Sequence, residues 1–266
     1  MSLAKYGSWA AVIGGSEGVG AEFARKLASD GVNLLLVARK PGPLEQIAKE
    51  IRGSFPVEVR TMSLDMTADN AVEKIIGATE GLDIGLLILN AGAGVTPGYF
   101  VNKDPKAADL TIRLNVTGPT ALASHFGPRM AARGRGAIMF VGSGAGEFGT
   151  AGLAVYSAAK AYIRTFAEAL WYELAPRGVH VSIAILGVTR TPALGRLGYP
   201  IDDPNVPGDD PKEVALEALA RLADGPVYYA PGAHEDTEML RGLSRRDAVC
   251  HLGELSKEIL TRGSAK

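Results

Sequence analysis

Short apolar runs alternate with longer amphipathic segments along most of the chain. The apolar runs predict strands at residues 9–14, 33–38, 57–63, 84–90, 137–142, 180–186 and 226–230. The segments between them predict helices at residues 17–29, 43–52, 68–77, 107–133, 156–175 and 211–222, and a last helix near 235–260. This alternation is typical of a parallel sheet with helices on both faces. We therefore expect a doubly wound α/β fold of about seven parallel strands.

The chain is expected to form a single domain over residues 1–266, a length that suits one large α/β core. Residues 195–211 are dense in proline, glycine and aspartate, and such a segment cannot keep a regular element for long. A loop over about 192–211 is therefore either a plain surface loop or a mobile lid over a substrate cleft. A C-terminal helical extension is expected over about 232–266.

Composition and charge exclude several classes of protein. A formal net charge of −1 provides no field for holding nucleic acid. Cys250 is the only cysteine, which excludes an intrachain disulfide and fits a cytoplasmic protein. The four histidines show no ligand spacing, so no metal site is expected. Without a secretory signal, and without an apolar run near the ~18–20 residues of a membrane span, no membrane span is expected.

A glycine-rich turn joins the first predicted strand to the first predicted helix. Glycine at these positions allows unusual backbone angles and lets a pyrophosphate approach the N-terminus of the helix. The bland alternative is a plain tight turn, but the flanking strand and helix favour a dinucleotide site of the Rossmann type. The residues expected to bind the cofactor here are Gly14, Ser16, Gly18, Val19 and Gly20.

The end of the second predicted strand indicates which dinucleotide is bound. An NAD enzyme of this type places an acidic residue there for the ribose hydroxyls, whereas this chain has Arg39 and Lys40. A guanidinium matches a 2′-phosphate in geometry and charge. The alternative is that Arg39 is only a solvated charge, and Glu17 argues against a phosphate nearby. We expect NADP(H), with NAD(H) as the less favoured cofactor.

The pentapeptide from Tyr156 to Lys160 suggests acid/base chemistry. Residues four apart share a helix face, which puts the phenol beside the ammonium. A nearby cation favours the phenolate and is expected to lower the tyrosine pKa toward neutrality. Tyr156 is then a usable proton donor or acceptor.

Together these motifs resemble the short-chain dehydrogenase/reductase family. The glycines follow its G-x-x-x-G-x-G spacing, Ser143 lies thirteen residues before Tyr156, and Asn115 matches the fourth catalytic member. The resemblance implies that Ser143 binds the substrate oxygen and Tyr156 exchanges the proton. It also implies that Lys160 binds the nicotinamide ribose and tunes Tyr156, which places both in the cofactor site, and that Asn115 holds a water in the proton path.

The same resemblance, which covers residues 8–191, implies further cofactor contacts. Asp65 matches an aspartate that binds the adenine amino group, although it could equally cap the helix that follows. The remaining matched positions, on the adenosine ribose side and the nicotinamide side, are Asn90, Ala91, Gly92, Thr189 and Thr191. Four positions depart from the family pattern: Ile13 replaces a threonine, Leu89 an asparagine, Leu186 a proline and Thr189 a valine.

The expected function is hydride transfer between NADP(H) and a carbonyl or secondary alcohol in a small molecule. One alternative is a sensor or scaffold that binds a dinucleotide without turnover; another is a reductase of carrier-linked 3-oxoacyl groups. The resemblance also implies a homodimer or homotetramer built on the helices at 107–133 and 156–175. The substrate pocket is expected to be edged by the loop at 195–211 and by Ala93, Gly94, Glu147, Phe148 and Gly187, with a plain surface turn at Glu147 and Phe148 as the alternative.

Overall fold

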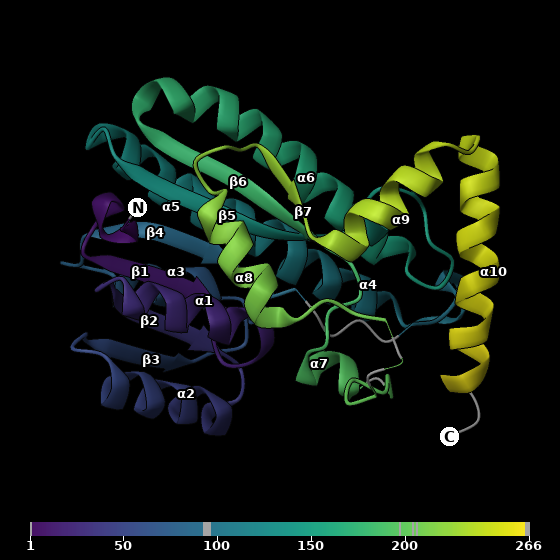
Figure 1. Cartoon of the computed structure of the whole chain (residues 1–266), viewed down its shortest axis with the longest axis horizontal. Helices are drawn as coiled ribbons and strands as arrows, with labels where there is room; N and C mark the ends of the chain where they lie inside the picture. Colours follow the sequence, from purple (N-terminus) through teal and green to yellow (C-terminus); the bar gives the residue numbers. More distant parts are fainter. Residues whose placement is uncertain (1, 93–96, 197, 204, 206, 264–266) are drawn as a thin grey trace.

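Seven parallel strands form one sheet in the order β3-β2-β1-β4-β5-β6-β7 (Figure 1). A computed structural model describes residues 2–92, 97–196, 198–203, 205 and 207–263, with only the backbone of 258–263. Ala93 and Gly94, expected at the pocket edge, lie outside these residues, as do Leu197, Pro204 and Val206 of the loop at 192–211. The strands are β1 (Trp9–Ile13), β2 (Asn33–Ala38), β3 (Val59–Ser63), β4 (Ile84–Leu89), β5 (Gly136–Ser143), β6 (Val179–Leu186) and β7 (Val227–Tyr229).

Helices cover both faces of the sheet, which confirms the expected doubly wound fold. One face packs against α1 (Gly18–Ser29), α2 (Pro41–Ser54) and α8 (Pro211–Ala220). The other packs against α3 (Ala71–Ala78), α5 (Gly118–Ala132) and α6 (Ala154–Leu174). The remaining helices are α4 (Pro105–Ile112), α7 (Pro192–Gly195), α9 (Pro231–Arg241) and α10 (Arg245–Gly263). In Figure 1, α9 and α10 stand beyond the carboxyl ends of the strands.

The strands read as continuous apolar runs because both of their faces are buried. Successive residues alternate between the two cores: Val12 lies in the core under α1 and α2, whereas Ile13 lies in the core under α3, α5 and α6. Leu36 and Val37 of β2 divide in the same way. A period of two with no polar face is the signature of a parallel strand between two helical layers.

Two predicted helices are each divided in the structure. The helix expected at 107–133 is α4 and α5 joined by a π-helical turn, η3 (Arg113–Thr117), which holds Asn115. Helical periodicity continues across such a turn, so the sequence does not reveal it. The helix expected near 235–260 is α9 and α10. Ser244 begins α10 by accepting a hydrogen bond from Asp247 N at 3.2 Å, an N-cap that separates the two.

The order of the strands places a crevice beside β1. The chain builds outward from β1 to β2 and β3, then crosses back to β4 on the other side of β1. In open α/β sheets, ligands bind at the carboxyl ends of the strands where this reversal occurs. The segments that follow β1 and β4, starting at Gly14 and Asn90, are therefore the first places to look for a site.

Within the described part of the chain, no helix is long and apolar enough to cross a membrane. The same residues contain no group of three or more histidine, cysteine, aspartate or glutamate side chains that could hold a metal ion.

Replacing Phe140 by alanine tests the core beneath α6. Phe140 is completely buried in β5 and makes an edge-to-face contact with Phe166 at 5.9 Å between ring centroids. The cavity left by Phe140→Ala should lower the free energy of unfolding by about 3–5 kcal/mol, measured by urea denaturation. Val101→Ala, at a side chain that is 87% exposed, is the control and should change it by less than about 0.5 kcal/mol. Equal effects would contradict the assigned burial.

Candidate active site

The glycine-rich turn between β1 and α1 is held from both neighbouring strands. Gly14 N donates to Val37 O of β2 at 2.7 Å. From the other side, Asn90 N and Ala91 N both donate to Ile13 O, at 2.9 and 2.7 Å, and Asn90 Nδ2 donates to Gly14 O at 2.8 Å. Asn90 therefore fixes the turn through both its backbone and its side chain.

Side chains could not replace the glycines of this turn. A Cβ at Gly20 would lie 2.0 Å from Gly14 O, and one at Gly14, where φ is +91°, would lie 2.7 Å from Ala91 N. Gly18 has φ of +56° and would bring a Cβ to 2.8 Å from Thr191 Cγ2. An open backbone at the start of a helix fits a pyrophosphate. Ser16 lies in this turn, and Val19 lies in the first turn of α1.

The carboxyl end of β2 presents positive charge to solvent. The Arg39 side chain is 71% exposed, and its guanidinium lies 3.8 Å from the Asp65 carboxylate. Asp65 does not cap α3, which begins at Ala71; it accepts hydrogen bonds from Thr67 N at 2.9 Å and Thr67 Oγ1 at 2.8 Å in a local turn. The exposed guanidinium has the charge and geometry that a ribose 2′-phosphate requires.

Ser143 and Tyr156 meet at the carboxyl end of β5. Ser143 is the last residue of the strand, and Tyr156 lies in the first turn of α6. Burial raises the pKa of the Tyr156 phenol, and the hydrogen bond with Ser143 lowers it by a smaller amount. The hydroxyl is therefore neutral at physiological pH and carries a proton that it can donate.

Lys160 is buried one helical turn after Tyr156, with 5% of the residue exposed. Its Nζ donates to Val141 O at 2.9 Å and lies 5.5 Å from the centroid of the Tyr156 ring. Burial lowers the pKa of Lys160 to about 8. The pKa of Tyr156 is therefore not lowered in this structure, contrary to the expectation, because desolvation of the phenol raises it.

Asn115 faces Lys160 across a small space. Asn115 Nδ2 donates to Thr111 O at 3.1 Å, whereas its buried Oδ1 has no hydrogen-bond partner among the described residues. A Cβ on Gly92 would lie 2.7 Å from both Asn115 Oδ1 and Lys160 Nζ. The two side chains also line a cavity of about 10 Å³, which is close to the room that one water needs. An unpaired acceptor beside a buried ammonium is a suitable place for such a water.

The segment after β6 lies against the glycine turn. Thr189 is buried, and Thr191 contacts Gly18 while its hydroxyl accepts a hydrogen bond from Leu194 N at 3.4 Å at the start of α7. Two backbone hydrogen bonds join Asp209 to the residues just after β6: Asp209 N donates to Val188 O at 2.8 Å, and Arg190 N donates to Asp209 O at 3.0 Å. The segment after β6 therefore begins beside the cofactor turn and returns to the same place.

A buried ionic cluster near Ser143 was not foreseen from the sequence. The Glu147 side chain is 4% exposed and accepts hydrogen bonds from Arg164 at 2.7 Å, Tyr229 at 3.0 Å and Arg241 at 3.2 Å. The next residue, Phe148, packs against Leu240 of α9 and Ala248 of α10. These contacts turn Glu147 and Phe148, expected at the pocket edge, toward the C-terminal helices. No local pattern marks partners so far apart in sequence.

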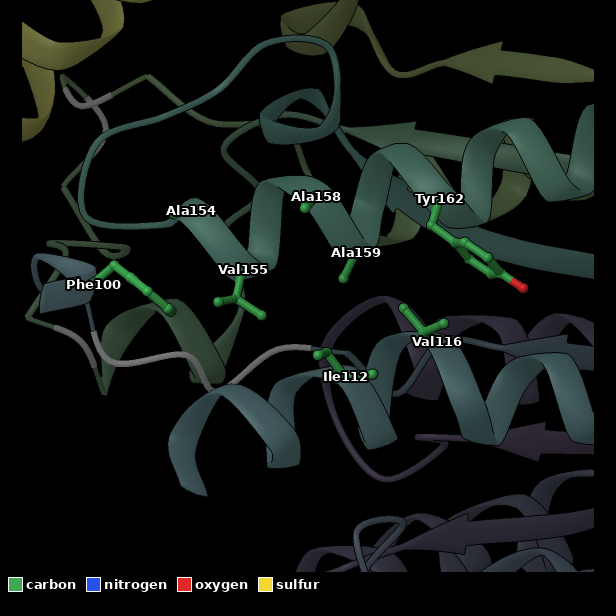
Figure 2. A pocket seen from close by; sticks show the side chains of 8 residues that line it. All are labelled: Phe100, Ile112, Val116, Ala154, Val155, Ala158, Ala159 and Tyr162. Carbon is green, nitrogen blue, oxygen red and sulfur yellow. The ribbon is translucent and has the colours of Figure 1, made fainter. Parts of the chain in front are cut away.

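A cavity also lies on a different face of α6. It measures about 470 Å³ and is lined by Phe100, Ile112, Val116, Ala154, Val155, Ala158, Ala159 and Tyr162 (Figure 2). Val155, Ala159 and Tyr162 point from α6 toward Ile112 and Val116, across from α6. None of the proposed catalytic side chains lines it.

Comparisons with known proteins agree with this geometry. A family model described as short chain dehydrogenase matches residues 8–199. The very-long-chain 3-oxoacyl-CoA reductase of Podospora anserina is 37% identical over 185 residues, which cover 68% of this chain and 54% of that protein. The 7beta-hydroxysteroid dehydrogenase of Collinsella aerofaciens is 34% identical over 190 residues, covering 71% of this chain and 72% of that one. The matched segment spans 54–57% of the length of three of the 3-oxoacyl-CoA reductases, those of Podospora anserina, Macaca fascicularis and Bos taurus.

Solved structures are similar over more of the chain. A 7beta-hydroxysteroid dehydrogenase structure has a TM-score of 0.87 at 28% identity and covers 95% of this chain and 99% of its own. A short-chain dehydrogenase from Sphingobium yanoikuyae in complex with NADPH has a TM-score of 0.77 at 32% identity and covers 84% and 87% of the two chains.

The buried ammonium of Lys160 predicts how stability depends on pH. Its pKa is lowered from the usual 10.5 to about 8, so above pH 8 the folded chain releases a proton that the unfolded chain keeps. Unfolding then takes up a proton, and stability should rise with pH by about 1–2 kcal/mol between pH 7 and 9.5. Urea denaturation of the wild type and of Lys160→Met measures the difference. If the free energy of unfolding changed with pH in the same way in both proteins, the Lys160 ammonium would not be desolvated.

Proposed function

Because the chain belongs to the short-chain dehydrogenase family, we propose that it is an oxidoreductase that transfers hydride between NADP(H) and a carbonyl or secondary alcohol. The observation that carries the proposal is the meeting of Ser143 and Tyr156 at the carboxyl edge, with buried Lys160 and Asn115 behind them. A glycine turn open to a pyrophosphate lies at the same edge. A dinucleotide sensor without turnover has no need of a hydrogen-bonded phenol next to a buried ammonium.

The proposed roles follow from the chemistry of each group. The reduced dinucleotide, when bound, supplies the hydride. Ser143 Oγ holds the substrate oxygen, and the neutral phenol of Tyr156 donates a proton to that oxygen as negative charge develops on it. Lys160 would hold the nicotinamide ribose when the cofactor is bound. Asn115 Oδ1 and Lys160 Nζ hold one water between them, which returns a proton toward Tyr156.

We propose NADP(H) over NAD(H) on the charge at the end of β2. The exposed guanidinium of Arg39, with Lys40 beside it, suits a 2′-phosphate, whereas no carboxylate ends this strand to hold ribose hydroxyls. The Sphingobium relative in complex with NADPH supports the same choice. Thr191, Asp65 and the backbone at Asn90, Ala91 and Gly92 complete the proposed cofactor site. Residues 192–211 are proposed to border the substrate, in a single-domain cytoplasmic enzyme.

A homodimer or homotetramer is proposed through the surface of α4 and α6. The cavity between these helices is lined by apolar side chains, and Ile112 and Tyr162 at its wall are each 42% exposed (Figure 2). Phe100, which is 60% exposed, extends the apolar surface. A contiguous apolar surface of this kind favours association, because a second copy would remove it from water.

Tyr156→Phe is the direct test of catalysis. Removal of the hydroxyl should lower kcat for NADPH oxidation at least about 100-fold and leave the Kd for NADPH within about twofold. The substrate panel should contain simple ketones, oxosteroids and 3-oxoacyl-CoA thioesters, the latter two because the named relatives are a hydroxysteroid dehydrogenase and 3-oxoacyl-CoA reductases. Binding of NADPH by the wild type without turnover of any member would favour the sensor.

Ile112→Asp tests the proposed interface. A carboxylate in the apolar cavity should shift the molar mass from light scattering toward the monomer, because a buried unpaired charge is costly. Leu216→Asp is a matched control on α8, on the other face of the sheet, where the leucine is 37% exposed. A monomeric wild type, or the same shift in both variants, would contradict the proposal.

A further inference from the structure

Glu17 is a carboxylate inside the glycine turn, beside the proposed cofactor path. It follows Ser16 and immediately precedes α1, and its side chain is 25% exposed. From its position in the sequence, Glu17 argues against a 2′-phosphate, since two anions would lie close together. The proposed preference for NADP(H) therefore requires something that compensates this charge.

Arg196 supplies that compensation from a distant part of the chain. Its guanidinium makes a two-pronged contact with Glu17: Nη1 donates to Oε2 at 2.9 Å, and Nη2 donates to Oε1. The two residues are separated by 179 positions in the sequence. Paired parallel hydrogen bonds between a guanidinium and a carboxylate are directional, and they are stronger than hydrogen bonds between neutral groups. The pair therefore fixes where the Glu17 carboxylate points.

The cations at the end of β2 act on the same carboxylate. Arg196, Lys40 and Arg39 all lower the pKa of Glu17, with the hydrogen bond from Arg196 as the largest contribution, so Glu17 is ionised at neutral pH. Arg39 in turn lies 3.8 Å from Asp65. Without Arg196, Arg39 and Lys40 would face two carboxylates, and their field on an arriving phosphate would be largely cancelled.

We propose that Arg196 is a specificity-determining residue for the cofactor, because it neutralises Glu17 and so preserves the positive field of Arg39 and Lys40 for the 2′-phosphate. This inference rests on the proposed function and adds to it a role for the segment after β6. Arg196 immediately follows α7, and Thr191 at the start of α7 already lies against Gly18. The segment proposed to border the substrate thus also determines which dinucleotide is preferred.

A double-mutant cycle on binding tests the role of Arg196. The dissociation constants of NADPH and NADH would be measured by titration calorimetry for the wild type, Arg196→Gln, Glu17→Gln and the double variant. Arg196→Gln should weaken NADPH about three- to tenfold and NADH less than twofold, because only NADPH carries the 2′-phosphate. Glu17→Gln should bind NADPH at least as tightly as the wild type, and the double variant should return to within about twofold of it.

Arg177→Gln is the matched control, an exposed arginine just before β6 at the opposite edge of the sheet, and it should leave both constants unchanged. Equal losses for NADPH and NADH in Arg196→Gln would overturn the proposal in favour of a purely structural role. A double variant as weak as Arg196→Gln would also overturn it, since Arg196 would then bind the phosphate directly. A wild type that binds neither dinucleotide, or prefers NADH, would instead refute the proposed cofactor, and this inference with it.

Discussion

The parallel direction of all seven strands is the constraint on which the site depends. It brings every strand's carboxyl end to one edge, so the residues that follow β1, β2, β4, β5 and β6 become neighbours there. Both faces of the sheet are then free for helices, and the apolar side chains of each strand divide between two cores. Catalytic and binding groups can vary at this edge without disturbing the interior that holds them in place.

Burial at this edge changes the chemistry of the site. The ammonium of Lys160 and the phenol of Tyr156 both lose water. The pKa of Lys160 is lowered and that of Tyr156 is raised, so burial favours the neutral form of each group. The spacing of Lys160 from Tyr156 alone therefore does not predict how the pKa of Tyr156 shifts. The hydrogen bond from Nζ to Val141 O and the unpaired Oδ1 of Asn115 show that position and partners decide what a buried charge does.

The cluster around Glu147 shows a structural role for the C-terminal helices. Its carboxylate binds arginines from α6 and α9 and the hydroxyl of Tyr229, and Phe148 is covered by residues of α9 and α10. The segment that leaves Ser143 is thereby anchored to the end of the chain. A buried carboxylate with several donors tends to specify one arrangement, because its hydrogen bonds are satisfied only when these partners are all in place.

Local features of the sequence determined the strands, most helix positions, the glycine turn and the helical proximity of Tyr156 to Lys160. Each of these depends on residues a few positions apart, whose spacing follows from backbone geometry. The π-helical turn at Asn115 was missed because helical periodicity continues across it, and the break between α9 and α10 at the Ser244 N-cap was missed as well. Only the tertiary structure decided that Arg196 meets Glu17, that Glu147 meets Arg241, and that burial raises the pKa of Tyr156. Those outcomes depend on side chains brought together by the folded sheet and on how much water remains around them, and neither is encoded in a short stretch of sequence.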